Sequence, residues 1–177
     1  CGAEAPVRVA ALGPRGTFSE QAAHKVFGRQ ITLLEGADIR EVFRLTEAGD
    51  AQFGVVPVEN STEGGVNATL DLLMETTLQV CNEVELRVTH CLLASENSPA
   101  PREIAGHEQA LAQCRNWLAT HYAGVPLFPK SSTAEAARAA ADDSEVMAIA
   151  SSEAATLYGL EVRARDIADV PGNTTRF

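Results

Sequence analysis

The polar residues that could do chemistry in this chain come directly after runs of apolar residues. Hydroxyl-bearing residues follow four such runs: Thr17 with Ser19, Ser61 with Thr62, Ser131 to Thr133, and Ser151 with Ser152. Where a strand ends and a helix begins, a hydroxyl can cap the helix, and the free N–H groups of the first turn can bind an anion. One such turn is an ordinary helix cap. Four of them on two facing parallel sheets would line a cleft that suits an anionic small molecule.

The stretch from Phe53 to Met74 contains the most distinctive of these turns. Its β-branched start predicts a buried strand that Pro57 loosens, so that residues 59–61 emerge at the carboxyl end. Two glycines then allow a sharp turn, and Asn67 is the expected N-cap of the next helix. The side chains expected on the core side of that helix are Leu70, Leu73 and Met74. Spacing alone favours a capped strand-to-helix turn without a ligand.

The other apolar runs alternate with amphipathic segments, a pattern typical of α/β proteins. In the first half, strands are expected over residues 7–12, 31–34 and from 54, with helices over 17–27 and after Asp38. Residues 78–95 are β-rich and are expected to cross into a second lobe. That lobe should contain helices over 108–122, from 133 and from 151, and strands over 125–128, 146–150 and 160–164. The two predicted lobes are residues 1–80 with 168–177, and residues 81–167.

Composition narrows the classes of partner. The 177 residues carry a net charge of -10, which argues against nucleic acid, because phosphate binding needs a basic face. No apolar run has the length of a membrane span, and no leader peptide precedes the first strand, so we expect a cytoplasmic protein away from membranes. The four cysteines and four histidines show no zinc-ligand spacing, so we expect reduced thiols, structural histidines and no metal.

Several longer motifs are similar to one known family, the prephenate dehydratase domain of bifunctional chorismate mutase/prephenate dehydratase proteins. They are GPRGTFSEQAA at 13–23, FGVVPVENSTEGGVNATLDLL at 53–73, HEQALAQCRNWL at 107–118, the turn at 131–137 and NTTRF at 173–177. Each is weak alone, but together, in this order, they are specific. The resemblance covers nearly the whole chain. It implies an α/β fold of two lobes, of the periplasmic-binding-protein type 2 kind, with the active site in the cleft between them.

The resemblance also implies which residues act. Thr175 falls on the family's essential threonine, a choice that spacing alone cannot make against Thr174. We expect Thr175 to donate to the leaving hydroxyl with help from Glu59, and Arg176 to be a carboxylate clamp or a structural anchor. The expected substrate-binding residues are Phe177, Asn60, Ser61, Thr17, Gly16, Ser131, Ser132 and Ser151.

The implied reaction converts prephenate to phenylpyruvate, CO2 and water, and it needs no cofactor. The alternatives are a non-catalytic binding module of the solute-binding kind and a catalytic domain made inert by truncation. A homodimer is expected, as is fusion to chorismate mutase and ACT regulatory domains. The family continues past its Thr-Arg-Phe signature with a further strand of the first lobe. Without that strand, we expect an unpaired sheet edge in this lobe and a Thr-Arg-Phe segment that is tethered on one side only.

Overall fold

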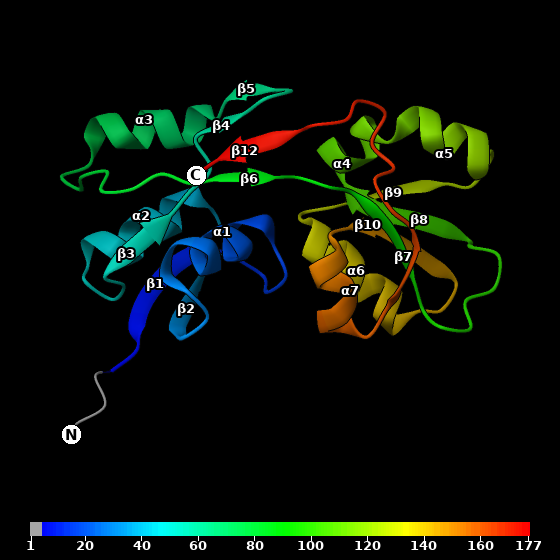
Figure 1. Ribbon diagram of the computed structural model, residues 1–177, viewed down its shortest axis with the longest axis horizontal. Helices are drawn as coiled ribbons and strands as arrows, with labels where there is room; N and C mark the ends of the chain where they lie inside the picture. The colour runs from blue at the N-terminus through cyan, green and yellow to red at the C-terminus, as the bar shows by residue number, and fades with distance from the viewer. Residues whose placement is uncertain (1–4) are drawn as a thin grey trace. The chain divides into compact units, whose positions relative to one another are not determined.

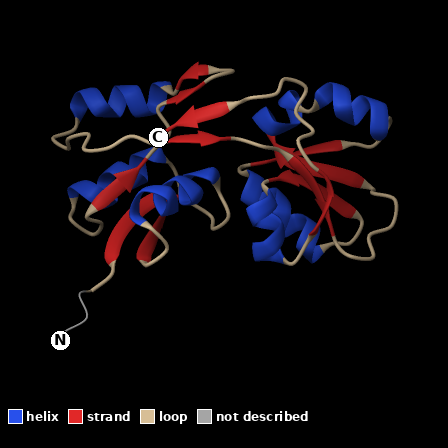
Figure 2. Cartoon of the chain, viewed as in Figure 1, coloured by secondary structure: helices blue, strands red, loops and turns tan. Residues whose placement is uncertain are grey.

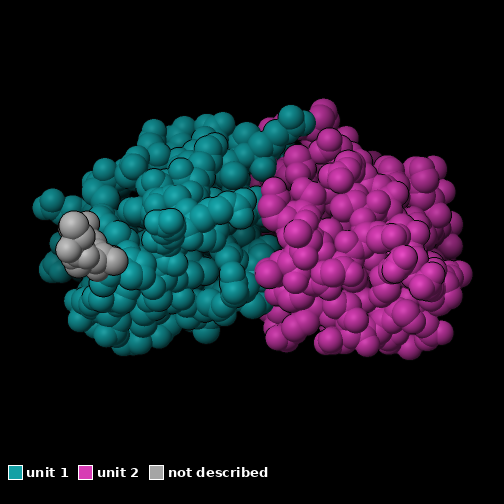
Figure 3. All heavy atoms as spheres, turned by 60° about the horizontal axis from the view of Figure 1, so that its bottom comes forward, with its two compact units in different colours: residues 1–87, 173–177 teal, residues 88–172 magenta. Residues whose placement is uncertain are grey.

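The chain forms two compact units, each with its own core. The computed structural model describes residues 5–177, so Cys1 lies outside the described residues. The first unit consists of residues up to Arg87 together with Asn173–Phe177, and the second consists of Val88–Gly172 (Figure 3). Residues 81–87 thus belong to the first unit and residues 168–172 to the second, which differs from the predicted lobe boundaries by these two short segments.

A three-stranded parallel sheet forms the base of the first unit. Its order is β2 (Ile31–Gly36), β1 (Val7–Leu12) and β3 (Phe53–Val55) (Figure 1). Helices α1 (Phe18–Phe27) and α2 (Ile39–Glu47) connect these strands. Val9 and Ala11 of β1 pack with α1, whereas Ala10 packs with Val42 of α2. Alternate residues of β1 therefore pack into the cores on the two opposite faces of the sheet. The predicted βαβαβ order of the first unit is confirmed.

A second, antiparallel sheet completes this unit. Its order is β5 (Gly64–Gly65), β4 (Glu59–Asn60), β12 (Thr174–Arg176) and β6 (Glu85–Arg87). The expectation that the Thr-Arg-Phe segment is tethered on one side only is wrong, because β12 is hydrogen-bonded between β4 and β6. The reason is that β6, which sequence reasoning placed in the other lobe, supplies the second neighbour. Phe177 and Val84 also exchange both backbone hydrogen bonds, at 2.8 and 3.0 Å.

Helix α3 (Asn67–Glu75) differs from its prediction in its cap and its buried face. Its N-cap is Val66, without a side-chain hydrogen bond, and not Asn67. Met74 is 87% exposed and Leu70 is 39% exposed, so neither points into the core. Thr69 is the buried residue of the helix, and its hydroxyl donates to the Pro57 carbonyl oxygen at 2.6 Å. Leu73, the third predicted side chain, is half-buried, so the apolar spacing was wrong for two of the three residues and could not anticipate the polar anchor at Thr69.

The second unit is built on a five-stranded mixed sheet. Its order is β11 (Glu161–Ala164), β7 (Cys91–Ala94), β10 (Val146–Ala150), β8 (Glu103–His107) and β9 (Leu127–Lys130) (Figure 2). Helices α6 (Thr133–Asp142) and α7 (Ser152–Tyr158) pack with one set of strand residues. Helices α4 (Glu108–Gln113) and α5 (Arg115–His121) pack with the alternate set. Because both faces are covered, β7 and β10 are buried along their whole length.

Residues 108–122 form two helices and not the single predicted one. The break falls at Cys114, and the N-terminus of α5 is capped from a distant part of the chain. The Asp169 carboxylate accepts from the backbone N–H groups of Asn116 and Trp117 at 2.9 and 3.0 Å.

None of the helices among residues 5–177 has the length and apolar character that crossing a membrane requires.

Candidate functional site

The candidate site is centred on Thr175, in the middle of strand β12. This residue is 8% exposed, and its cross-strand neighbour on β4 is Asn60. The Asn60 side-chain amide donates to Thr175 Oγ1 at 2.8 Å. The hydroxyl of Thr175 thus accepts one hydrogen bond from the protein, and its own proton remains to be donated elsewhere.

The orientation of the Asn60 amide is determined by its other contacts. Asn60 Oδ1 accepts from the backbone N–H groups of Thr62 and Glu63 at 2.9 and 3.3 Å. A backbone N–H can only donate, so the oxygen of the amide must face the turn and its nitrogen must face Thr175. The Glu-Asn-Ser-Thr turn thereby aims a hydrogen-bond donor at Thr175.

Asn173 is a further residue of this site that sequence reasoning did not select. It is buried, and its Oδ1 accepts from the hydroxyls of Ser61 and Thr62 at 3.1 and 3.0 Å. The signal was available in the NTTRF motif, because residues two apart on a strand project to the same side. Once Thr175 is chosen, Asn173 is therefore the next residue to consider.

Glu59 and Arg176 lie on the opposite side of the strand pair from Thr175. They are cross-strand neighbours, and their charged groups approach to 4.0 Å, with roughly half of each side chain exposed. Alternation along β4 and β12 directs them away from the side that Asn60 and Thr175 share. The structure therefore brings Asn60, and not Glu59, to Thr175. Phe177 packs against the apolar cluster around β1 and α1.

Gly16 and Thr17 form the start of α1. Thr17 Oγ1 donates to the Leu12 carbonyl oxygen at 2.8 Å and accepts from the Glu20 N–H at 3.2 Å. The Glu20 carboxylate in turn accepts from the Gly16 N–H at 2.5 Å. Gly16 has a φ of +94°, which favours glycine. The hydroxyl of Thr17 is therefore engaged as a helix cap, in the way its spacing with Glu20 predicts.

Ser131, Ser132 and Ser151 lie in the second unit, where β8, β9 and β10 run parallel. Ser132 and Ser151 cap α6 and α7 by accepting from Glu135 N–H at 3.0 Å and Ala154 N–H at 3.1 Å. Ser131 contacts the Glu135 carboxylate through its hydroxyl, which lowers the pKa of that carboxyl group. These turns lie at the carboxyl edge of the sheet, where α/β proteins bind ligands.

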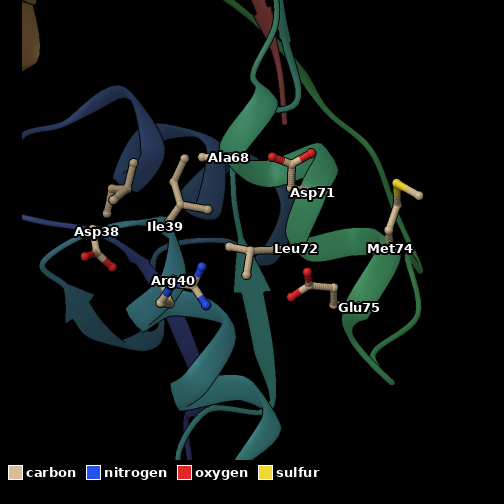
Figure 4. Close-up of a pocket in the computed structure, with 9 residues that line it drawn as sticks. Asp38, Ile39, Arg40, Ala68, Asp71, Leu72, Met74 and Glu75 are labelled. Carbon is tan, nitrogen blue, oxygen red and sulfur yellow. The ribbon is translucent and has the colours of Figure 1, made fainter.

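Other features of the described residues do not add to this site. Residues 5–177 contain no group of three His, Cys, Asp or Glu side chains placed to bind a metal. A groove of about 890 Å³ lies between the start of α2 and helix α3, lined by residues that include Arg40, Asp71 and Glu75 (Figure 4). Neither Thr175 nor Asn60 lines this groove, so we do not assign the catalytic site to it.

Comparisons with known proteins agree on one family. The prephenate dehydratase family model matches residues 9–177. A bifunctional chorismate mutase/prephenate dehydratase of Stutzerimonas stutzeri is 51% identical over 176 residues, which cover 98% of this chain and 48% of that protein. This chain therefore spans about half the length of that relative.

Two solved structures are similar over nearly the whole chain. Prephenate dehydratase from Arthrobacter aurescens, solved in complex with L-Phe, is 36% identical with a TM-score of 0.88 and covers 97% of this chain and 59% of that one. A protein described as GqqA, a novel type of quorum quenching acylase, is 32% identical with a TM-score of 0.83 and covers 96% of this chain and 62% of that one. With the family motifs on the strands and turns described above, the chain belongs to the prephenate dehydratase family.

Proposed function

We propose that this chain is the catalytic domain of a prephenate dehydratase, a lyase of phenylalanine biosynthesis. The observation that carries the proposal is the hydrogen bond that the Asn60 amide donates to Thr175 Oγ1. Because this hydroxyl of the family's signature threonine accepts from Asn60, its own proton is free to be donated to the substrate. The likeness to an acylase does not favour acylase chemistry, because the prephenate dehydratase structure has the higher identity and TM-score.

The reaction balances without a cofactor. The bond between the ring and its carboxylate breaks, CO2 leaves, and the electron pair enters the ring. The carbon–oxygen bond at the opposite ring carbon breaks, and the hydroxide takes up one proton to leave as water. Aromatisation of the ring supplies the driving force. The protein therefore has to hold the dianion, supply a proton donor to the leaving hydroxyl, and exclude water from the departing carboxylate.

Thr175 is the hydrogen-bond donor to the leaving hydroxyl. A threonine hydroxyl is a very weak acid, so it needs help when charge develops on its oxygen. The Asn60 amide gives that help, since its N–H already points at Thr175 Oγ1 and needs no reorganisation in the transition state. Asn60 thus takes over the assisting role that sequence reasoning gave to Glu59.

Arg176 and Phe177 act as anchors of β12. Arg176 faces Glu59 across the strand pair, and Phe177 packs in the apolar cluster of the first unit. Together they hold the strand that carries Thr175.

The other predicted substrate-binding residues form turns at helix N-termini, where N–H groups are suited to carboxylates of the substrate. These residues are Gly16, Thr17, Ser131, Ser132 and Ser151. The whole protein is a cytoplasmic homodimer in which this domain is fused to chorismate mutase, as in the bifunctional relatives, and to an ACT regulatory domain.

Incubating the purified chain with prephenate and following phenylpyruvate by its absorbance in base tests this proposal. Turnover that exceeds the uncatalysed rate and saturates with prephenate is the expected result. Prephenate binding without turnover, measured by calorimetry, would instead identify a binding module or a domain made inert by truncation. Absence of both binding and turnover would contradict the proposed function outright.

A further inference from the structure

We propose that Asn173 is a positioning residue that holds the Asn60 amide on Thr175 through the turn at residues 61–62. This inference rests on the proposed function for its kinetic consequence. Its structural basis is a set of hydrogen bonds within the first unit that joins the segment before Thr175 to the turn after Asn60. No step of the chemistry described above involves Asn173 itself.

The turn is closed on β12 from both its backbone and its side chains. Ser61 N–H donates to the Thr174 carbonyl oxygen at 2.9 Å, and Thr174 N–H donates to Ser61 Oγ, also at 2.9 Å. Since Ser61 Oγ accepts from a backbone N–H, its single proton is the one directed to Asn173 Oδ1, 3.1 Å away. The same carbonyl oxygen accepts the Thr62 hydroxyl at 3.0 Å. One buried amide oxygen therefore uses both hydroxyl protons of the turn.

Thr62 links this contact to the catalytic hydrogen bond. Its side chain is held by Asn173, and its backbone N–H donates to Asn60 Oδ1 at 2.9 Å. Asn60 in turn donates to Thr175 Oγ1 at 2.8 Å. The path from Asn173 through Thr62 and Asn60 to Thr175 is continuous, and each contact lies within ordinary hydrogen-bond distance. Losing the acceptor at residue 173 leaves two hydroxyls without their partner and frees the turn to rotate Asn60 away from Thr175.

The decisive comparison is between Asn173→Leu and Asn173→Asp. Leucine removes the acceptor at similar volume, so kcat should fall by roughly 10-fold or more while KM changes little, because positioning acts in the transition state. Aspartate keeps an oxygen acceptor that two hydroxyls can satisfy, so its kcat should stay within a few-fold of wild type. Thr174→Ala is the matched control, since it removes a hydroxyl from the same strand on the side away from Thr175.

Hydrogen exchange of the Thr62 and Glu63 amides gives a readout that does not depend on turnover. Both amides donate to Asn60 Oδ1, so their exchange should become faster in Asn173→Leu and remain slow in Asn173→Asp. Thr62→Val should reproduce part of the loss, and combining it with Asn173→Leu should cost less than the sum of the two.

The outcomes separate this inference from the proposed function. Wild-type kcat and slow amide exchange in a folded Asn173→Leu variant would overturn the positioning role, as would equal losses in Asn173→Leu and Thr174→Ala. If the wild-type chain forms no phenylpyruvate, the proposed function fails, and the amide exchange alone then decides whether Asn173 holds the turn. Should Asn173→Leu fail to fold, Thr62→Val provides the test, because it removes one of the two hydroxyls that Asn173 holds; wild-type kcat and slow amide exchange in that variant would overturn the inference.

Discussion

At the scale of single residues, the two adjacent threonines of β12 have different surroundings. Thr175 is buried and accepts from Asn60, whereas Thr174 is half-buried and has Arg87 of β6 as its cross-strand neighbour. Thr175→Ala should therefore lower kcat by a factor on the order of 10² to 10⁴ with little change in KM, because it removes the proposed donor, which would act in the transition state. Steady-state kinetics with prephenate measure both constants.

Thr174→Ala is the control for that experiment and should retain most turnover. Similar losses in the two variants would mean that the donor is misassigned. Before the fold was known, only the resemblance to the family's Thr-Arg-Phe signature could select Thr175. Alternation along β12 now gives the physical reason, since only Thr175 shares a side with Asn60.

Asn60→Asp tests the direction of the hydrogen bond between residues 60 and 175. A carboxylate can only accept, so the Thr175 hydroxyl would turn its proton toward residue 60 and away from the substrate. We expect kcat to fall at least as far as in Asn60→Ala, although aspartate is the closer match in shape. Steady-state kinetics of the two variants at neutral pH make the comparison. A kcat for Asn60→Asp near that of wild type would show that Asn60 does not need to donate.

At the scale of elements, the sequence predicted best what is determined locally. The caps at Thr17, Asp38, Ser132 and Ser151 each accept from a backbone N–H three residues later, so a short window of sequence contains both partners. The pairing of β12 was not predicted, because its neighbours β4 and β6 come from residues 59–60 and 85–87, far away along the chain. Pairings at that distance depend on the whole fold, which local patterns do not describe.

Helix α5 offers a test of such a long-range contact. The Asp169 carboxylate caps it from a connection more than fifty residues away, and Asp169 N–H also donates to the Gln113 carbonyl oxygen at 2.7 Å. Asp169→Ala should lower the free energy of unfolding by about 1–2 kcal/mol, the usual cost of losing a cap. Thermal or urea unfolding measures the change.

Asp142→Ala is a suitable control for that measurement. Asp142 is exposed at the carboxyl end of α6, where a negative charge opposes the helix dipole, so its removal should leave stability unchanged or slightly raised. Asp169→Asn keeps an oxygen acceptor and should lose less than Asp169→Ala. Equal stability of wild type and Asp169→Ala would show that α5 does not depend on this cap.

At the scale of the whole molecule, the second unit should limit stability toward both acid and base. Burial is the main cause that lowers the pKa of His90 below 6.5. The hydrogen bond that His90 Nε2 makes to the Gln113 side-chain oxygen raises this pKa, and nearby His107 lowers it further. In the unfolded chain His90 takes up its proton below about pH 6.5, while the folded chain resists it. The contribution to stability is therefore complete above pH 6.5 and is lost as the pH falls through the lower, folded pKa.

Two buried thiols of the same unit act in the opposite direction. Burial raises the pKa of Cys114 from 9.0 to about 12 and also raises that of Cys91. The unfolded thiols ionise near pH 9, whereas the folded ones stay protonated, so their contribution is complete below pH 9 and is lost as the pH rises toward 12. The free energy of unfolding should therefore be highest between about pH 6.5 and 9.

Urea unfolding between pH 5 and pH 10 under reducing conditions, for wild type, His90→Gln and Cys114→Val, measures this profile. His90→Gln should lose less stability than wild type between pH 7.5 and pH 5, because it has no imidazole to protonate, even if it is less stable at pH 7.5. Cys114→Val should lose less between pH 8.5 and pH 10. Each unit of pKa difference is worth about 1.4 kcal/mol, which urea unfolding resolves. If His90→Gln lost as much stability as wild type between pH 7.5 and pH 5, the loss would have to come from carboxylates and not from this buried histidine.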